Sequence, residues 1–516
     1  MQSRPALTSE PDIRAREITS HDVARSAGTT LLARLGAIIE VIAQPIYVWL
    51  FGLASYGIYT ALWAAVTLVE TVADLGMTSA LQRTVPQAKS EREAVAALRA
   101  ALILGVTPPL ILALLASLGA PLIAHAFNAA DADAAKLVDF IRLFAWSLPL
   151  WAFIEVSTSA LRARRVFGAE IRLRLFWEQV VRLIVASGFW LAGFGTLSLF
   201  YGHLVSLLVI CALCIQLLRR HFDLSLLRSG PSAEPVWRKS WLAGISVMPA
   251  NLVARFFSDA PTLALNALLP GAAGAIAGAQ FALARKISSI VQTIRLTFTY
   301  VLSPLASAAL SDGNEVVARI YSYATRISLV VALPVCCALI GGSATLLKTI
   351  GGGMETAVWA LAVLLLARLA EAVTGTAAPI QQVLSRYSSQ YIGSVMGVLL
   401  STLLAVFLLP EGGLMGMTLA VALGLVVTAA IPVVQLHRQD GLQPYDAPFG
   451  RVFGRAMGVG LACLVLGFGL NYLPLAVGVA LLIPLALAGL WASCRFALPL
   501  EDRTSLGRVA QVLRLV

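Results

Sequence analysis

Apolar stretches long enough to cross a membrane recur along almost the whole chain, from residue 28 to residue 496. A helix of about 20 residues rises about 30 Å, which matches the hydrocarbon thickness of a bilayer. Only 13% of the 516 residues are charged, about half the fraction typical of soluble domains. The sequence therefore predicts an all-α integral membrane protein. Residues 1–27 are polar and mix acids with bases, which is not typical of a signal peptide.

Fourteen transmembrane helices are predicted from these stretches, and the connections between them are short. The predicted spans lie near residues 28–50, 55–77, 95–118, 138–160, 174–195, 197–218, 241–269, 273–302, 319–342, 355–384, 390–409, 412–436, 452–473 and 475–496.

The spans are predicted to form two six-helix bundles, residues 28–218 and 241–436, with helices 13 and 14 added at 452–496. The remaining segments are predicted to be cytoplasmic: the tail 1–27, the linker 219–240, the loop 437–451 and the tail 497–516. In the last tail, Leu506, Val509, Ala510 and Leu513 share one helical face, which predicts an amphipathic helix on the membrane surface.

Basic residues indicate which loops face the cytoplasm. Loops after odd-numbered spans hold only Lys136 and Lys348. Loops after even-numbered spans hold Arg83, Lys89, Arg92, Arg162, Arg164, Arg165, Arg172, Arg219, Arg220, Arg228, Arg238, Lys239, Arg386, Arg438 and Arg451. Both termini are therefore expected to be cytoplasmic. The net charge of +11 is spread over these loops and not gathered on one module, so no nucleic-acid partner is expected.

A weak internal repeat relates the two halves. Pro45 in the first span and Pro261 in the seventh lie 216 residues apart, and each is followed by a glycine-rich turn that opens the next helix. Similarity between two six-span halves is typical of transporters built from internal repeats.

Signals of enzymatic chemistry are weak. No lysine follows a glycine, so a nucleotide-binding loop of the G-x-x-x-x-G-K-[ST] type is excluded. The pair Asp131 and Asp133 has the spacing of a sugar-nucleotide transferase motif, but a solvated loop is the expected explanation. The histidines and cysteines lack metal-ligand spacing. No catalytic residue, metal or cofactor is predicted.

The segment LFGLASYGIYTALWAAVTLVETVADLGMTSALQRTVPQ, residues 50–87, resembles the second-helix region of the bacterial polysaccharide transporter (O-antigen flippase) family. That family belongs to the superfamily of multidrug, oligosaccharidyl-lipid and polysaccharide exporters. The matching residues are Gly52, Tyr56, Gly57, Tyr59, Asp74, Leu75, Gly76, Ala80 and Arg83. The chain has Trp49, Ala54 and Ser55 where the family often has an arginine and acids, so the carried glycan stays open.

The resemblance implies two bundles around a central cavity. It also implies that an undecaprenyl-diphosphate-linked oligosaccharide moves from the cytoplasmic to the outer leaflet of the bacterial inner membrane by alternating access. The expected partners are this lipid-linked oligosaccharide, membrane lipids and other polysaccharide-assembly proteins.

Basic residues inside the spans are candidates for binding the diphosphate. At 1.5 Å per residue, Arg255, Arg285 and Arg368 lie about 18–21 Å into their spans, near the membrane centre. Charges at that depth are costly and normally face a bundle interior or a watery cavity. Lys286 and Arg34 complete the predicted set. Pairing with local acids is the alternative, because Asp259 lies four residues after Arg255, and Glu371 three after Arg368.

Three intramembrane acids, Glu40, Glu70 and Asp259, are candidates for coupling or gating. Glu70 matches Lys286 at the repeat offset, which indicates either a salt bridge between the bundles or a proton-sensitive gate. Asp74 is expected to be an interfacial residue near Arg83, and the Glu178–Arg182 pair is expected to be structural.

Two other functions stay open. A cation-coupled drug or metabolite antiporter of the same superfamily would share the architecture, although it usually has twelve spans. A membrane-embedded glycan polymerase or glycosyltransferase would need a large outward catalytic loop, and the longest outward connection has only about twenty residues.

Overall fold

The computed structural model describes residues 43–164, 166, 168, 171–229, 234–309, 314–384, 387–504, 511, 514 and 515. Regular structure in these residues is helical throughout. Nine helical segments in the described ranges are long and apolar enough to cross a membrane. The prediction of an all-helical membrane protein is therefore confirmed.

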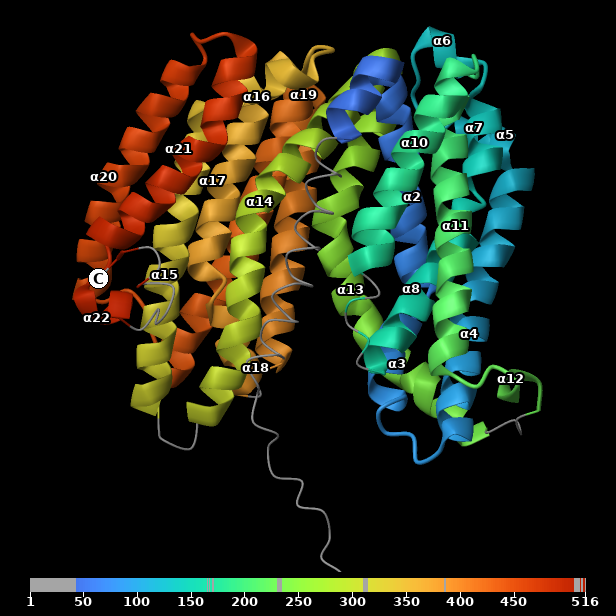
Figure 1. The fold of residues 1–516 in the computed structure, drawn as a ribbon, viewed down its shortest axis with the longest axis horizontal. Coiled ribbons are helices and arrows are strands. Elements are labelled where there is room, and N and C mark those ends of the chain that lie inside the picture. Colours follow the sequence, from blue (N-terminus) through green and yellow to red (C-terminus); the bar gives the residue numbers. More distant parts are fainter. Residues whose placement is uncertain are drawn as a thin grey trace, which may run out of the picture.

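Helices α2 to α12 lie together on one side of the molecule (Figure 1). They are α2 (Leu53–Ala73), α3 (Met77–Thr84), α4 (Glu91–Leu118), α5 (Ala120–Ala124), α6 (Asp131–Ala134), α7 (Leu137–Phe144), α8 (Ser147–Ala163), the π-helical turn η1 (Ile171–Trp177), α10 (Glu178–Leu191), α11 (Leu197–His221) and α12 (Leu226–Ser229). We call the end that carries α6 the α6 end and the opposite end the α3 end.

The yellow to red helices lie on the other side, with α13 and α14 between the two groups (Figure 1). The helices are α13 (Glu234–Leu268), α14 (Gly271–Ala309), α15 (Asn314–Gly341), α16 (Ser343–Ile350), the 3-10 turn η3 (Met354–Ala357), α17 (Val358–Thr374), α18 (Ala377–Val383), α19 (Tyr387–Asp440), α20 (Ala447–Leu470), α21 (Leu475–Phe496) and α22 (Leu500–Thr504). Helix α19 is broken at Gly413, whose φ of 49° and ψ of −126° are not helical.

Helix α2 packs against α13 and α14, and α3 packs against α13. A glycine permits close contact in each helix, Gly57 within α2 and Gly76 just before α3. A Cβ atom on Gly57 would lie 1.9 Å from the carbonyl oxygen of Ala275 on α14, and one on Gly76 would lie 2.1 Å from that of Gly244 on α13. Gly76 also has a φ of +72°, which glycine adopts at little cost. Both glycines belong to the motif that carries the family resemblance, and the structure gives them a packing role.

At the α6 end, Asn128 and Asn266 join the chain after α5 to the last turn of α13. The side-chain amide of Asn266 donates to the carbonyl oxygen of Asn128 at 2.8 Å, and its Oδ1 accepts from the Asn128 backbone N–H at 3.2 Å. The Asn128 side chain in turn donates to the carbonyl oxygen of Asn266 at 2.9 Å. We call these hydrogen bonds between Asn128 and Asn266 the asparagine clasp. Asn266 is fully buried, so the bonds take the place of the hydrogen bonds that its polar atoms would otherwise make with water.

Asp133 differs from its prediction as part of a solvated loop. It is buried, accepts a hydrogen bond from the Ser55 hydroxyl at 2.5 Å and another from the Thr196 hydroxyl at 2.9 Å. Asp133 therefore ties α6 to α2 and to the start of α11, while Asp131 is exposed.

Helices α20 and α21 pack against α15. The following short helix α22 is fixed there by Asp502, which accepts hydrogen bonds from Arg326 at 2.7 and 3.0 Å. Leu506, Val509, Ala510 and Leu513, on which the amphipathic tail was predicted, lie outside the described residues.

Candidate functional site

A polar cavity of about 480 Å³ lies between α2, α3, α8 and α13. Three carboxylates, Glu70, Asp74 and Glu155, and two guanidinium groups, those of Arg162 and Arg255, line it together with hydroxyl and amide side chains. Because acids outnumber bases on its wall, we call it the acidic cavity.

Glu70 and Asp74 reach the cavity from one face of α2, one helical turn apart, and each is only 4% exposed. Asp74, which was predicted to be an interfacial residue near Arg83, is buried, whereas Arg83 is exposed. Asp74 Oδ2 instead accepts a hydrogen bond from the Thr78 hydroxyl at 3.0 Å. Its Oδ1 is buried and has no hydrogen-bond partner in the described part of the chain.

The charged groups that face Glu70 are Asp74, Glu155, Arg174 and Arg255. The structure therefore brings Glu70 together with Arg255.

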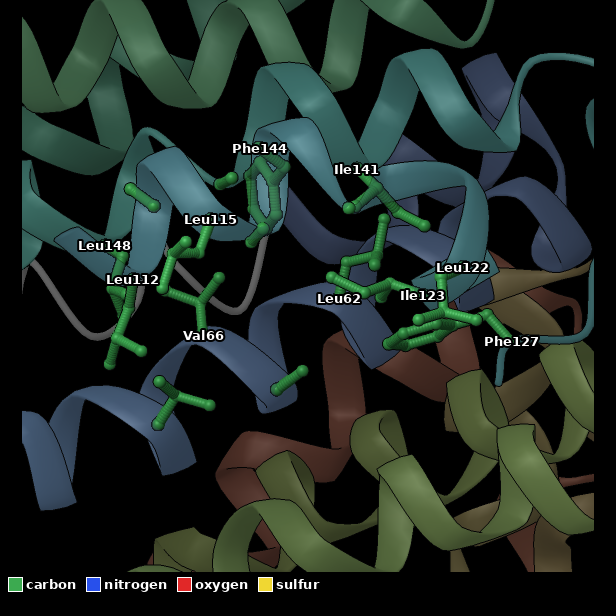
Figure 2. Close-up of a pocket in the computed structure, with 16 residues that line it drawn as sticks. Leu62, Val66, Leu112, Leu115, Leu122, Ile123, Phe127, Ile141, Phe144 and Leu148 are labelled. Atoms are coloured by element: carbon green, nitrogen blue, oxygen red, sulfur yellow. The ribbon is translucent and has the colours of Figure 1, made fainter. Parts of the chain in front are cut away.

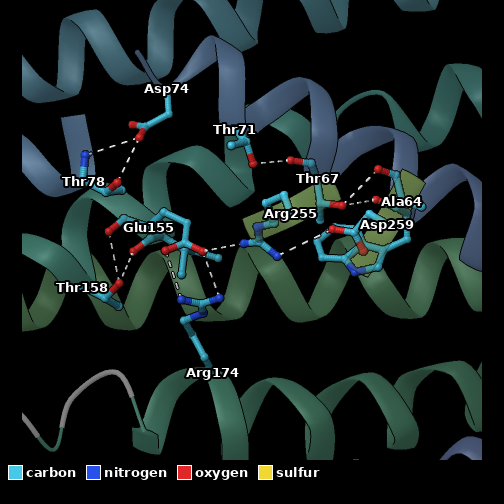
Figure 3. A network of polar contacts seen from close by, with 12 residues as sticks. Ala64, Thr67, Thr71, Asp74, Thr78, Glu155, Thr158, Arg174, Arg255 and Asp259 are labelled. Carbon is cyan, nitrogen blue, oxygen red and sulfur yellow. Dashed lines mark hydrogen bonds and ion pairs between the residues drawn. The ribbon is translucent and has the colours of Figure 1, made fainter. Parts of the chain in front are cut away.

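Glu155 on α8 lies at the centre of the charged network in Figure 3. Arg174 contacts it through two parallel contacts, Nη2 to Oε1 at 2.9 Å and Nη1 to Oε2 at 3.0 Å. The same Oε1 lies 3.7 Å from Nη2 of Arg255 on α13. One carboxylate is thus shared between an arginine of the η1 turn and an arginine of α13.

Arg255 also lies 3.9 Å from Oδ2 of Asp259, one turn further along α13. The local pairing considered from the sequence is therefore present, but it is only one of two contacts. Both distances exceed those of a hydrogen bond. The side chain of Arg255 is 35% exposed, and it lies in the cavity wall.

Neither Glu155 nor Arg174 is singled out by the sequence. The signal that would have found Glu155 is a carboxylate well inside the apolar span predicted at 138–160, far from Asp139 at the start of that span. Arg174 lies at the edge of a predicted span, where a basic residue is common, so its role depends on the π-helical turn that carries it. Such turns occur frequently at functional sites.

A second polar cavity of about 320 Å³ lies between α13, α14, α17, α18 and α19. Arg368 and Glu371 line it, and Nη1 of Arg368 donates to Oε2 of Glu371 at 2.6 Å. Ala254 and Ser258 of α13 line both this cavity and the acidic cavity. The two cavities therefore adjoin along one small-residue stretch of α13.

The other predicted site residues are placed differently. Arg285 and Lys286 are half-buried on α14 and line neither polar cavity. Arg34 and Glu40 lie outside the described residues. Glu178 and Arg182 form the predicted ion pair within α10. Arg182 also donates to the Tyr59 hydroxyl at 3.3 Å, and that hydroxyl lies 2.7 Å from Nδ1 of the buried His203.

An apolar pocket of about 450 Å³ lies between α2, α4, α5, α7 and α8 (Figure 2). Leucine, isoleucine, valine and phenylalanine side chains fill its wall, among them Leu62, Leu115, Ile141 and Phe144. It offers no charged group to a headgroup. Among the described residues, no cluster of three acids, histidines or cysteines is placed to hold a metal ion.

The family model for polysaccharide biosynthesis proteins matches residues 46–354, more than half of the chain. The chain belongs to this family. The resemblance inferred from residues 50–87 is thereby confirmed at family level. No curated protein matches the chain.

Several solved transporter structures have a fold similar to that of this chain. Lipid II flippase MurJ in an inward closed conformation aligns with a TM-score of 0.70 at 12% identity, over 89% of this chain and 97% of its own. An inward-facing multidrug resistance MATE transporter of the MOP superfamily aligns with a TM-score of 0.62 at 18% identity, over 80% and 94%. An outward-facing MATE transporter aligns with a TM-score of 0.56 at 16% identity, over 81% and 96%.

Proposed function

We propose that this polysaccharide biosynthesis family protein is a flippase. Its substrate would be an undecaprenyl-diphosphate-linked oligosaccharide, such as a repeat unit of O-antigen, capsule or exopolysaccharide, which it moves from the cytoplasmic to the outer leaflet by alternating access. The observation that carries the proposal is the pair of polar cavities that adjoin along α13, each with an arginine in its wall. The MurJ-like fold and the family support the same class of substrate.

In this proposal Arg255 and Arg368 bind the diphosphate from the two cavities. Guanidinium groups suit this task because their paired N–H groups match phosphate oxygens. Arg285 and Lys286 on α14, together with Arg34 of the first span, add positive charge near the path of the headgroup. Glu70 and Asp259, which lie beside Arg255, and Glu40 are the proposed coupling or gating acids.

The proposed topology has fourteen spans in two six-helix bundles plus helices α20 and α21, with the α3 end and both termini in the cytoplasm. Cysteines placed singly at the exposed positions Asp131 and Glu411 should react with an impermeant thiol reagent in intact cells. Cysteines at the exposed positions Arg83 and Arg220 should react only after lysis. Labelling of Arg83→Cys in intact cells would reverse the orientation and with it the direction of transport.

Flipping is tested with the purified protein in proteoliposomes that contain a fluorescent polyprenyl-diphosphate oligosaccharide. The protein should increase the rate at which the labelled lipid becomes accessible from the opposite side. No ATP is required in this scheme, since outward movement of an anion gains about 2.3 kcal/mol per charge per 100 mV of inside-negative potential. Equal rates with and without the protein would refute the proposal.

A cation-coupled antiporter is the second candidate, and the acidic cavity favours it. An excess of carboxylates over arginines, with a buried Asp74 oxygen that has no described partner, suits a cationic ligand better than an anionic one. The same proteoliposomes distinguish the two functions. Uptake of an organic cation driven by a proton or sodium gradient, without movement of the labelled lipid, would favour the antiporter.

A further inference from the structure

We propose that Glu155 occupies, at Arg255, the position that a phosphate of the substrate takes, so that a lipid-linked diphosphate binds by displacing this carboxylate. The inference rests on the proposed function and adds a residue that regulates the same site. It follows from the unequal way in which two arginines hold one carboxylate.

The contact of Glu155 with Arg174 is the stronger of its two contacts with arginine. Two nearly equal contacts of 2.9 and 3.0 Å give the bidentate geometry that is strongest for arginine and carboxylate. The guanidinium carbon of Arg174 also lies 4.4 Å from the ring centre of Trp151, which is buried on the same helix as Glu155. Glu155 therefore stays paired with Arg174 on the α8 side of the cavity, and Arg255 is the group that changes its partner when a ligand binds.

The contact of Glu155 with Arg255 is weaker, and a phosphate can replace Glu155 in it. At 3.7 Å it is too long for a hydrogen bond, and so is the 3.9 Å contact of Arg255 with Asp259. A phosphate oxygen could approach the same guanidinium to about 2.8 Å in a charge-assisted hydrogen bond. Because Arg255 is partly exposed to a cavity of about 480 Å³, the anion has room to reach it.

The charges of the cavity wall explain why a displaceable acid is needed. Without substrate, Arg255 is compensated by Glu155, Asp259 and Glu70, so that a mid-membrane guanidinium is not left without opposite charge. When a diphosphate compensates Arg255 instead, the link between α8 and α13 is broken. Substrate binding is thereby coupled to a contact between two helices that line the cavity.

The experiment measures binding of two probes, farnesyl diphosphate and inorganic pyrophosphate, to the full-length protein in nanodiscs. Glu155→Gln removes the competing charge and should tighten binding of both probes about tenfold, the scale of one partly buried ion pair. Glu155→Asp, which shortens the side chain and keeps its charge, should tighten binding less, and it serves if Glu155→Gln does not fold. Glu178→Gln, which removes a buried carboxylate from an ion pair outside the cavity, should leave binding unchanged.

The outcomes separate this inference from the proposed function. If Arg255→Gln weakens binding while Glu155→Gln and Glu155→Asp do not tighten it, the displacement is refuted and the headgroup site stands. If Arg255→Gln leaves binding unchanged, the headgroup site itself is wrong. Farnesyl diphosphate should bind more tightly than pyrophosphate in every variant. The reverse order would identify a free diphosphate as the ligand and overturn the assignment to a lipid.

Discussion

Arg255 and Arg368 line two polar cavities that adjoin along α13, and their carboxylate partners hold them in different ways. Arg255 has two partners at 3.7 and 3.9 Å and a side chain that is 35% exposed. Arg368 has Glu371 at 2.6 Å and a side chain that is 4% exposed. The sequence predicts a similar depth and the same charge for both residues. In the structure, Arg255 has only long contacts with its partners, whereas Arg368 forms a short, buried ion pair.

The difference teaches that the depth of a charge in the membrane does not by itself define a binding residue. A short, buried ion pair satisfies both charges and is costly to break from one side. Two long contacts satisfy an arginine only in part and leave it able to take another anion. Arg255 therefore has the geometry of a ligand-exchanging residue, whereas Arg368 would have to bind a diphosphate while it stays paired with Glu371.

The largest effect is expected from Arg368→Gln. Glu371 would lose its partner at 2.6 Å inside the protein, and breaking a buried pair from one side costs about 3–5 kcal/mol of stability. Thermal unfolding in detergent should show a clear loss, and the double variant Arg368→Gln/Glu371→Gln should regain most of it. If this stable double variant also flips lipid normally, Arg368 has no role in headgroup binding.

Arg255→Gln should behave in the opposite way. Its long, partly exposed contacts contribute little to folding, so thermal stability should change by less than about 1 kcal/mol. Flipping should fall about 100-fold, since removing one partner of a charge pair in a binding site costs about 2–5 kcal/mol. Lysine should rescue only in part, because it keeps the charge and loses the paired donors.

Arg319→Gln, at an exposed position on α15 that lines neither polar cavity, is the matched control and should change neither stability nor flipping. Unfolding of Arg255→Gln, or its full rescue by Asp259→Gln, would show that Arg255 is a structural residue like Arg368.

The sequence predicts the helical membrane fold because a run of apolar side chains has one stable solution in a bilayer, a helix whose backbone groups are paired internally. It also predicts the local pairs of Arg255 and Arg368, because residues three or four apart share a helical face. It does not predict the contact between Glu155 and Arg255, since these residues are 100 positions apart and meet only when α8 packs near α13. For a related reason, the burial of Asp74 is not predicted: it depends on α4, where a Cβ atom on Gly105 would lie 3.0 Å from Oδ1 of Asp74.

A smaller effect is expected from Asn266→Ala, which removes the Asn266 side chain from the asparagine clasp at the α6 end. These uncharged contacts hold the end of α13 in place, so that Arg255 in the middle of the helix can exchange its partners without loosening the helix. Asn266→Ala leaves the backbone N–H and C=O of Asn128 without their partners and should cost about 1–3 kcal/mol. Thiol accessibility at the α6 end should rise as well, while binding of farnesyl diphosphate should change less than in Arg255→Gln. A larger change in binding would show that the ends of α13 control the site more than Arg255 does.

The smallest effect is expected from Glu91→Gln, which tests whether burial is what separates Arg368 from an ordinary ion pair. Glu91 at the start of α4 pairs with Arg164, but both side chains are substantially exposed, at 40% and 31%. Water and salt screen such a pair, so its loss should lower stability by at most about 1 kcal/mol, and high salt should shrink the difference. The Arg368–Glu371 pair should respond little to salt, because screening ions do not enter the protein interior. Equal losses for Glu91→Gln and Arg368→Gln in thermal unfolding would mean that burial does not set the strength of either pair, and the contrast between Arg255 and Arg368 would then need another physical basis.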